Sequence, residues 1–246
     1  MPRFFVPNDA FLDGKVLISG EDAFHIARSL RMATGDEITV CDMRKKEYSC
    51  KLTKIRDDEC VAEVLSECEG KTESPIDITL FMAYPKGDKL EVVIQKAVEL
   101  GASKIIPFES SRCIKRPSPD KAEKQNARYQ RIAEEAAKQC GRAALPTIAL
   151  PVSFKEAVKM AKESELPLFC YEGDGTKSLK SVLNQSRLAK SASLLIGCEG
   201  GFSIEEARFA IDSGLIPVNL GPRILRCETA PSYALSALSY CFELGE

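Results

Sequence analysis

Two apolar, strand-like runs near the C-terminus constrain this chain most, because each ends in a glycine turn that leads into a helix signal. Leu194–Ile196 runs into Gly197, and Val218–Leu220 runs into Gly221. A strand that ends in glycine and opens a helix brings bare backbone N–H and C=O groups close to a ligand. The two turns are only 24 residues apart in a chain of 246, so we expect both to contribute to one site.

Both turns also carry charged side chains that a plain connection between a strand and a helix does not need. Glu199 lies in the first turn, Arg223 and Arg226 lie in the second, and Glu228 follows. Two ordinary structural turns remain the alternative interpretation. The combined charge and glycine content favours a functional site.

Strand-like and helix-like segments alternate from about residue 75 onward. This alternation predicts an α/β domain with a mostly parallel sheet and helices on both of its faces. Ligands of such sheets bind beyond the C-terminal ends of the strands, where both glycine turns fall. The strands we expect include 76–84, 104–108, 166–171, 192–196 and 216–220, and the longest expected helix runs from about 118 to 140.

Residues 1–72 predict a separate, small β-rich domain, because short alternating strands there accompany one expected helix over 21–32. The polar segment 67–74 serves as the linker, so the second domain spans 75–246. In the helix, His25, Arg28 and Arg31 follow one another at i, i+3 and i+6, which places them along one side. They are candidates for phosphate or base contacts. A half-buried histidine beside two solvated arginines is the alternative.

Charge is distributed unevenly although the formal net charge is only −2. Residues 1–74 carry a net charge of −4 and residues 75–246 a net charge of +2. The stretch from Arg112 to Arg142 holds nine basic residues and four acidic ones. Such an excess suits a surface that faces phosphates, whereas a solvated helix face is the alternative.

Cysteine and histidine usage argues against several kinds of site. None of the ten cysteines has C-x-x-C spacing and His25 is the single histidine, so we expect no metal site and discount hydrolase triads. We expect the cysteines to be reduced and mostly buried as small apolar side chains. No apolar run is long enough for a membrane span or a signal peptide, so the expected location is cytoplasmic.

Common nucleotide-binding motifs are missing. The G-x-G-x-x-G fingerprint of dinucleotide-binding folds does not fit residues 197–203, and no G-x-x-x-x-G-K-[ST] motif occurs. Neither NAD nor ATP is therefore favoured. A small ligand held largely by backbone groups between two apolar turns remains.

Several segments of the chain resemble the motifs of a known family. IGCEGGFSIEE (196–206) and LGPRILRCETA (220–230) resemble the second and third motifs of the SPOUT class of S-adenosylmethionine-dependent RNA methyltransferases. The similarity is greatest to the bacterial 16S rRNA uracil-N3 methyltransferases, and it includes KGDKLEVVIQKAVELG, RYQRIAEEAAKQCGR and an N-terminal H-x-x-x-x-L-R followed by G-D. Cys198 and Cys227 depart from the family, which usually has proline and threonine at these positions.

The resemblance implies a PUA-like β-barrel at the N-terminus and a SPOUT-like, mostly parallel sheet with a deep trefoil knot at the C-terminus. It implies S-adenosylmethionine as cofactor, N3 of a uridine in 16S rRNA or the small ribosomal subunit as substrate, and a homodimer with cofactor sites near the dimer interface. Two alternatives stay open. One is a SPOUT enzyme that methylates a ribose 2′-OH, and the other is a non-catalytic RNA-binding or ribosome-assembly protein.

The same resemblance assigns residues to roles. N3 of uracil must lose a proton, and negative charge then spreads onto the ring oxygens, so a carboxylate and a cation are needed. Glu199 and Arg226 are the expected catalytic pair. Cofactor contacts are expected from Ile196, Gly197, Gly201, Leu220, Gly221, Ile224 and Leu225. RNA contacts are expected from His25, Arg28, Arg31, Lys86, Arg112, Lys115, Arg116 and Arg223.

Overall fold

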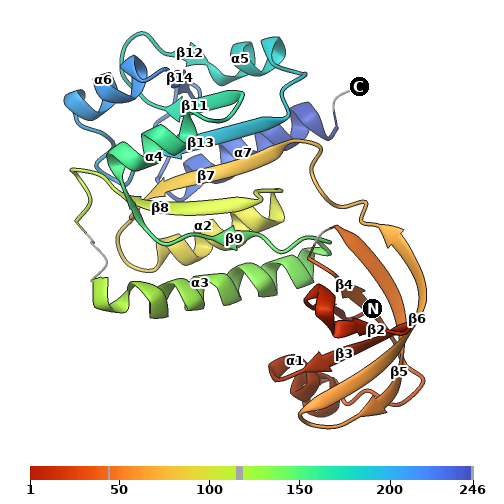
Figure 1. Cartoon of the computed structure of the whole chain (residues 1–246). Helices are drawn as coiled ribbons and strands as arrows, with labels where there is room; N and C mark the ends of the chain where they lie inside the picture. Colours follow the sequence, from red (N-terminus) through yellow and green to blue (C-terminus); the bar gives the residue numbers. More distant parts are fainter. Residues whose placement is uncertain (44, 115–118, 245–246) are drawn as a thin grey trace. The chain divides into compact units, whose positions relative to one another are not determined.

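The computed structural model of the chain describes residues 1–43, 45–114 and 119–244 (Figure 1). Two compact units can be separated in it: Met1–Glu73 with Ala137–Leu145, and Ser74–Ala136 with Pro146–Glu246. The sequence placed 137–145 in the second domain. The polar linker composition of 67–74 indicates where the chain leaves the first unit, but nothing in the composition indicates that 137–145 returns to it.

The first unit is a curled six-stranded sheet of order β1-β4-β5-β6-β3-β2 (Figure 1). β1 pairs with β4 in parallel, and all other pairs are antiparallel. Alternating apolar residues of these strands point inward to form one buried core, which includes Phe4, Ile18 and Leu52. The strands are β1 Arg3–Phe5, β2 Phe11–Leu12, β3 Lys15–Ser19, β4 Glu37–Cys41, β5 Lys46–Ile55 and β6 Glu59–Glu69, with a 3₁₀ turn at Asn8–Ala10.

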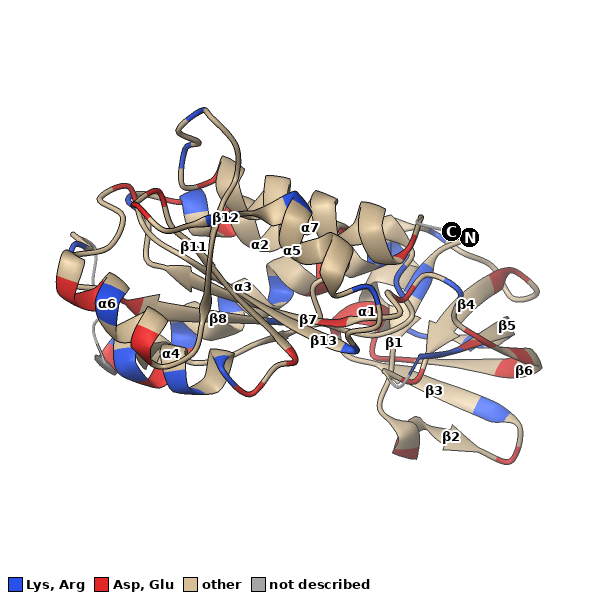
Figure 2. Cartoon of the chain, turned by 90° about the horizontal axis from the view of Figure 1, so that it is seen from above, with Lys and Arg blue, Asp and Glu red and all other residues tan. Residues whose placement is uncertain are grey.

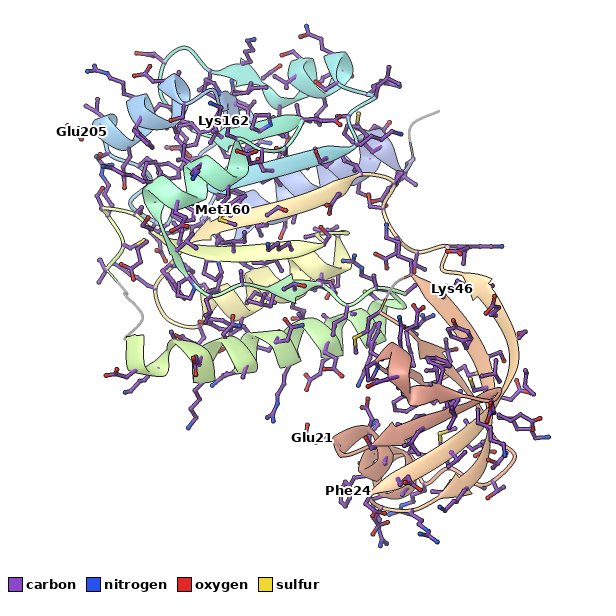
Figure 3. The ribbon with its side chains drawn as sticks, in the orientation of Figure 1. Glu21, Phe24, Lys46, Met160, Lys162 and Glu205 are labelled. Atoms are coloured by element: carbon purple, nitrogen blue, oxygen red, sulfur yellow. The ribbon has the colours of Figure 1, made fainter. Side chains whose placement is uncertain are left out.

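The helix expected over 21–32 is shorter and irregular, which corrects the sequence prediction. An α-helical turn α1 (Glu21–Phe24) continues into a π-helical turn η2 (His25–Ser29), and Arg31 has a left-handed φ of 51°. A π-turn closes i→i+5 hydrogen bonds rather than i→i+4, so His25, Arg28 and Arg31 do not follow the expected i, i+3, i+6 line. Phe24 is more than half exposed and projects from this unit (Figure 3).

A buried ion pair ties the segment 137–145 into the first unit. Arg142 Nη2 lies 2.6 Å from Glu73 Oε2, and both side chains are almost fully buried. Glu73 Oε1 also accepts hydrogen bonds from the backbone N–H groups of Ala143 and Ala144 at 3.0 and 3.1 Å. Burial opposes ionisation of Glu73, but Arg142 and these N–H groups outweigh it and lower the pKa of the carboxyl.

The second unit contains an eight-stranded sheet whose pairs are all parallel, as the alternating pattern predicted. Its order is β10-β8-β7-β13-β11-β14-β12, with β9 beside β8 (Figure 1). The central strands β7, β13 and β11 are nearly continuous apolar runs because helices cover both faces. The strands are β7 Asp77–Ala83, β8 Lys104–Glu109, β9 Thr147–Ile148, β10 Val152–Ser153, β11 Leu166–Cys170, β12 Lys177–Ser178, β13 Ser191–Ile196 and β14 Ile216–Asn219.

Helices lie on both faces of this sheet, with α4 and α6 on one side and α2 and α7 on the other (Figures 1 and 2). Figure 2 shows basic and acidic positions interspersed along α4 and α6, and Glu205 of α6 points outward in Figure 3. α6 starts at a capping box: Ser203 Oγ accepts the Glu206 N–H, and Glu206 accepts the Ser203 N–H. The helices are α2 Lys89–Glu99, α3 Pro119–Cys140, α4 Phe154–Ala161, α5 Leu179–Gln185, α6 Ile204–Asp212 and α7 Thr229–Phe242.

Candidate active site

A cavity of about 830 Å³ lies at the C-terminal ends of three parallel strands, β11, β13 and β14. Both glycine turns line it, which is the convergence that their sequence predicted. β11 lies between β13 and β14 in the sheet. The two turns therefore form opposite walls, and the end of β11 forms the wall between them.

The first turn, 197–201, is shaped by close backbone packing. A Cβ added to Gly197 would lie 3.0 Å from the Phe202 ring and 3.2 Å from Gly201 Cα, so no larger residue fits without displacing the turn. Gly201 has a left-handed φ of 62° and donates its N–H to the Cys198 carbonyl at 2.9 Å. Phe202 anchors the turn in the core by an edge contact with Phe169 at 4.8 Å.

The second turn places Gly221 at a φ of 105°, with open space where a side chain would project. A residue with a Cβ is strained at this angle. The glycine therefore leaves backbone groups uncovered at the cavity. Apolar side chains flank it: Leu220 and Leu225 are half-buried, while Ile224 is 83% exposed. An isoleucine this exposed at a cavity suits a ligand that would cover it.

The third wall was missed by the sequence prediction of site residues. Cys170, Tyr171 and Glu172, at the end of β11, line the cavity. The Tyr171 ring stacks on Phe169 at 5.3 Å and lies so close to Gly173 that a Cβ there would clash with it. The run LPLFCYEGDG carries the same signal of an apolar strand followed by glycines. What the sequence lacked was the position of this strand between the other two.

Three arginines, Arg112, Arg223 and Arg226, line the cavity and are exposed. Arg112, in the loop after β8, donates from Nη1 to the Gly200 carbonyl at 2.8 Å. Cationic side chains so arranged can stabilise negative charge that develops on a substrate. The predicted residues of this unit, Glu199, Arg112, Arg223, Arg226 and the seven expected cofactor contacts, thus line one cavity.

Glu199 is held by the segment that begins α2. Its carboxylate accepts the backbone N–H of Lys86 at 3.1 Å, and Lys89 Nζ lies 3.1 Å from it. The same ammonium lies 3.1 Å from Glu228, just before α7. Lys89, which sequence reasoning did not single out, therefore joins the carboxylates of the two turns. In the sequence Lys89 is only the first residue of an amphipathic helix, and nothing there indicates a contact with Glu199 or Glu228.

The ionisation states of this cluster follow from its contacts. Burial opposes ionisation of Glu199, but hydrogen bonds from its own N–H, from Lys89 and from Lys86 outweigh it and lower the pKa of Glu199. Hydrogen bonds from Cys227 and from its own N–H lower the pKa of Glu228. Burial, together with the hydrogen bond to Glu228, raises the pKa of the Cys227 thiol to about 12. The cluster therefore holds two carboxylates, one ammonium and a neutral thiol.

The remaining predicted RNA contacts are distributed over both units. His25, Arg28 and Arg31 are exposed in the first unit, and Arg28 forms an ion pair with Asp57. Lys86 is exposed in the second unit. Lys115 and Arg116 lie outside the described residues.

The basic stretch 112–142 is not one continuous exposed surface. Arg128 pairs with Glu91 at 2.9 Å and Lys138 with Asp22 at 2.7 Å. Arg142 is buried and bonded to Glu73, so this residue is removed from any phosphate-facing surface, contrary to the sequence prediction.

No cluster of three or more histidine, cysteine or acidic residues that could hold a metal occurs within the described part of the chain. The described helices also include none with the length and apolar character needed to cross a membrane. None of the ten cysteines, all of which lie within the described residues, forms a disulfide bond, and six of them are buried.

Comparison with known families gives two matches. A family described as "RNA methyltransferase domain" matches residues 72–239, and one described as "RNA methyltransferase PUA domain" matches residues 18–65.

Relatives and solved structures cover almost the whole chain. "Ribosomal RNA small subunit methyltransferase E" of Bacillus subtilis is 37% identical over 92% of this chain and 90% of its own length. The protein of the same name from Synechocystis is 34% identical over 98% of this chain and 78% of its own. A solved structure of a protein described only as hypothetical has a TM-score of 0.90 at 33% identity, covering 99% of this chain and all of its own. A ribosomal RNA small subunit methyltransferase E from Neisseria gonorrhoeae bound to S-adenosyl methionine has a TM-score of 0.84 at 30% identity, covering 98% of both chains.

Proposed function

The chain belongs to the RNA methyltransferase family of the ribosomal RNA small subunit methyltransferase E proteins, and from this premise we propose that it methylates N3 of a uridine in 16S rRNA with S-adenosylmethionine as the methyl donor. The observation that carries the proposal is the convergence of both glycine turns and Arg226 on one cavity. The relatives' name supports small-subunit rRNA as the substrate, and the family resemblance supports N3 of uridine.

The residues of the cavity fit the cofactor. Its volume of about 830 Å³ lies within the range of small-molecule sites. The open space above Gly201 and Gly221 would give an adenosine access to backbone groups. Ile196, Leu220, Ile224 and Leu225 supply apolar walls. When bound, the cofactor supplies an activated methyl group.

Arg226 is proposed to stabilise the uracil anion. It is exposed at the cavity, so its guanidinium is available to a substrate. Negative charge spreads onto the uracil oxygens as the N3 proton leaves, and a fixed cation lowers the energy of that state. Removing one such group from other active sites reduces kcat by about 10²–10³-fold.

Glu199 is proposed to act by holding the first turn and the start of α2 in place. An ionised carboxylate that already accepts hydrogen bonds from Lys86 and Lys89 is a weak proton acceptor. The N3 proton would then pass to solvent, with Arg226 making it more acidic. Of the expected catalytic pair, Arg226 therefore has the direct role and Glu199 the positioning role.

The target uridine must be unpaired or flipped out, because N3 lies on the Watson–Crick edge. Exposed cations around the cavity, Arg112 and Arg223, and Lys86 near it are proposed to contact the surrounding phosphates. His25 and Arg31 of the first unit are proposed to contribute further contacts, since this unit matches a PUA domain of RNA methyltransferases. The cytoplasm, where ribosomal subunits are assembled, is the proposed location.

A homodimer is proposed on the basis of α7. This helix has no charged residue, yet Tyr233 and Tyr240 are 46% and 72% exposed. Both line a groove of about 620 Å³ between α5 and α7, which also includes Leu220 and Gly221 of the second turn. A second copy packed here would lie next to the cofactor cavity. The trefoil knot implied by the family resemblance stays a prediction.

Titration of S-adenosylmethionine into the purified protein tests the proposed site. We expect saturable binding by calorimetry, lost in Leu220→Arg because the new side chain would occupy the cavity. Leu188→Arg is the matched control, since Leu188 is 90% exposed and lies away from the cavity lining. Light scattering and circular dichroism would confirm that both variants keep the assembly and fold of the parent. A folded parent protein that shows no binding would overturn the cofactor site.

A further inference from the structure

Two thiols and a hydroxyl meet behind the first glycine turn. Ser110 Oγ lies 3.2 Å from Cys113 Sγ and 3.9 Å from Cys198 Sγ, so both thiols contact the same hydroxyl. All three residues are at most 6% exposed. Cys113 follows β8 and Cys198 follows β13, so the contact joins two strand ends that are far apart in the sequence. Of the two cysteines, only Cys198 lines the cavity.

The backbone around this pair is fixed by further contacts between the same two segments. Glu206 accepts the Ser111 N–H and hydroxyl at 2.7 and 2.8 Å. Arg112 bonds to the Gly200 carbonyl at 2.8 Å, and a Cβ on Gly200 would lie 3.0 Å from Arg112 Cβ. The thiols therefore meet because of the fold around them, rather than by a chance orientation of two mobile side chains.

The two thiols differ in reactivity. Hydrogen bonds from the Cys113 thiol, the Gly200 N–H and Ser110 lower the pKa of Cys198 despite its burial, and the same contact with Cys198, together with burial, raises the pKa of Cys113. A thiolate is the nucleophilic form of cysteine. Cys170 provides a comparison, because it lines the same cavity but burial raises the pKa of its thiol to about 12.

We propose that Cys198 and Cys113 form an oxidisable dithiol in the wall of the cofactor cavity, and that their disulfide and the bound cofactor exclude each other. The second clause rests on the cofactor site proposed above. Transient disulfides with a sensing role are the form expected in a reducing compartment. The oxidant is a peroxide, which reaches Cys198 through the cavity.

The chemistry needs two steps. The Cys198 thiolate attacks one oxygen of hydrogen peroxide, the O–O bond breaks, and Cys198 sulfenic acid and hydroxide form. The Cys113 sulfur then attacks the sulfenic sulfur, the S–S bond forms, and the sulfenic oxygen leaves as water with the Cys113 proton. Two electrons pass from the two thiols to the peroxide. A small dithiol reverses the reaction by exchange.

Closing the disulfide must change the cavity. An S–S bond is about 2.05 Å long, far shorter than a non-bonded contact between two sulfur atoms, so Cys198 must move toward Cys113. Its carbonyl is bonded to the Gly201 N–H, and the cavity wall therefore moves with it. By linkage, the disulfide weakens cofactor binding by the same factor by which the cofactor disfavours the disulfide.

The test uses the full chain with Cys68→Ser, which removes the one exposed cysteine. This protein is treated with stoichiometric hydrogen peroxide, with and without saturating S-adenosylmethionine, and digested under non-reducing conditions for mass spectrometry. We expect a peptide linked through Cys113 and Cys198, suppressed by the cofactor, with Cys170 unmodified. Calorimetry should show cofactor affinity reduced about tenfold or more by oxidation, and restored by dithiothreitol.

The variant Cys113→Ser keeps Cys198 in the cavity but lacks the resolving thiol. We expect no linked peptide; with stoichiometric peroxide Cys198 should stop at the sulfenic acid, and with excess peroxide it should go on to the sulfinic acid, which dithiothreitol does not restore. Failure of the linked peptide to form in the parent, oxidation at Cys170 in preference to Cys198, or unchanged cofactor affinity after oxidation would overturn the proposal. Another outcome is a protein that forms the linked peptide on oxidation but binds no cofactor when reduced. That result would overturn the proposed function and the coupling, and would support the dithiol itself.

Discussion

Replacing Glu73 by glutamine should destabilise the first unit strongly. The Arg142 guanidinium is 5% exposed and the Glu73 carboxylate 7% exposed, and they are joined at 2.6 Å. Glutamine keeps the size of the side chain but leaves a buried cation without its anion. Removing one partner of such a buried pair costs about 3–5 kcal/mol. For a chain of this length this corresponds to a fall in Tm of roughly 6–20 °C.

The pH dependence provides an independent check of the same contact. The pKa of Glu73 is lowered from its ordinary value of 4.5. The unfolded chain therefore takes up the proton first as pH falls, so the contribution of the pair to stability is complete above about pH 4.5 and is lost below it. The stability difference between the parent protein and Glu73→Gln should be constant at neutral pH and shrink as pH falls through the acid range.

Urea denaturation followed by circular dichroism measures both effects. Glu67→Gln is the matched control, because Glu67 pairs with Lys46 at 3.4 Å on the surface, where the two side chains are 60% and 42% exposed and ion pairs contribute little. A shift of the transition by Glu73→Gln no larger than that by Glu67→Gln, or a stability difference unchanged at low pH, would contradict the stabilising role of the buried pair.

Three further predictions concern the cavity. Gly221→Ala should weaken cofactor binding about tenfold by calorimetry, since the left-handed backbone costs a residue with a Cβ about 1–2 kcal/mol. Gly175→Ala is the control and should leave binding unchanged, because Gly175 also has a positive φ of 78° but does not line the cavity. Arg226→Met should lower kcat about 10²–10³-fold in a methyl-transfer assay and leave cofactor affinity intact; equal losses in both would assign Arg226 to cofactor binding instead. Arg112→Met should reduce the slope of log affinity for single-stranded RNA against log salt by about 0.7, and an unchanged slope would remove Arg112 from the RNA footprint.

The central features of the site could be predicted from the sequence for a physical reason. Glycine at the end of an apolar strand, followed by a helix, has few structural solutions, and the strands of a parallel sheet end on one side. Gly197 and Gly221 therefore had to lie at the same edge. Their meeting at one cavity follows from this rule, and Arg226, which comes after Gly221 in the second turn, lines the same cavity.

Other parts of the site depend on strand order, which periodicity does not contain. β11 precedes β13 in the chain but lies between β13 and β14 in the sheet, so the role of Tyr171 was not visible. Lys89 joins Glu199 and Glu228 only because α2 starts beside both turns. Contacts between segments more than a hundred residues apart carry no local signal.

The first unit shows the same limit. The alternating strands were predictable, but the π-turn at His25–Ser29 and the left-handed Arg31 were not, because a helical pattern over 21–32 does not distinguish an α-turn from a π-turn. The sequence also did not indicate which residue pairs with Glu73, since Arg142 is one of nine basic residues in the stretch 112–142. Its burial is decided by the return of 137–145 to this unit.

The most direct test of the account is to map the methylated position in small-subunit rRNA after incubation with the protein and S-adenosylmethionine, with naked rRNA and assembled subunits as parallel substrates. N3 methylation blocks the Watson–Crick edge, so reverse transcription should stop at one uridine, and nucleoside mass spectrometry should find the methyl group on the base. A methyl group on a ribose 2′-OH, with unhindered reverse transcription, would contradict the proposed function in favour of a different SPOUT reaction. No methyl transfer to either substrate by a protein that binds the cofactor would contradict the proposed rRNA substrate.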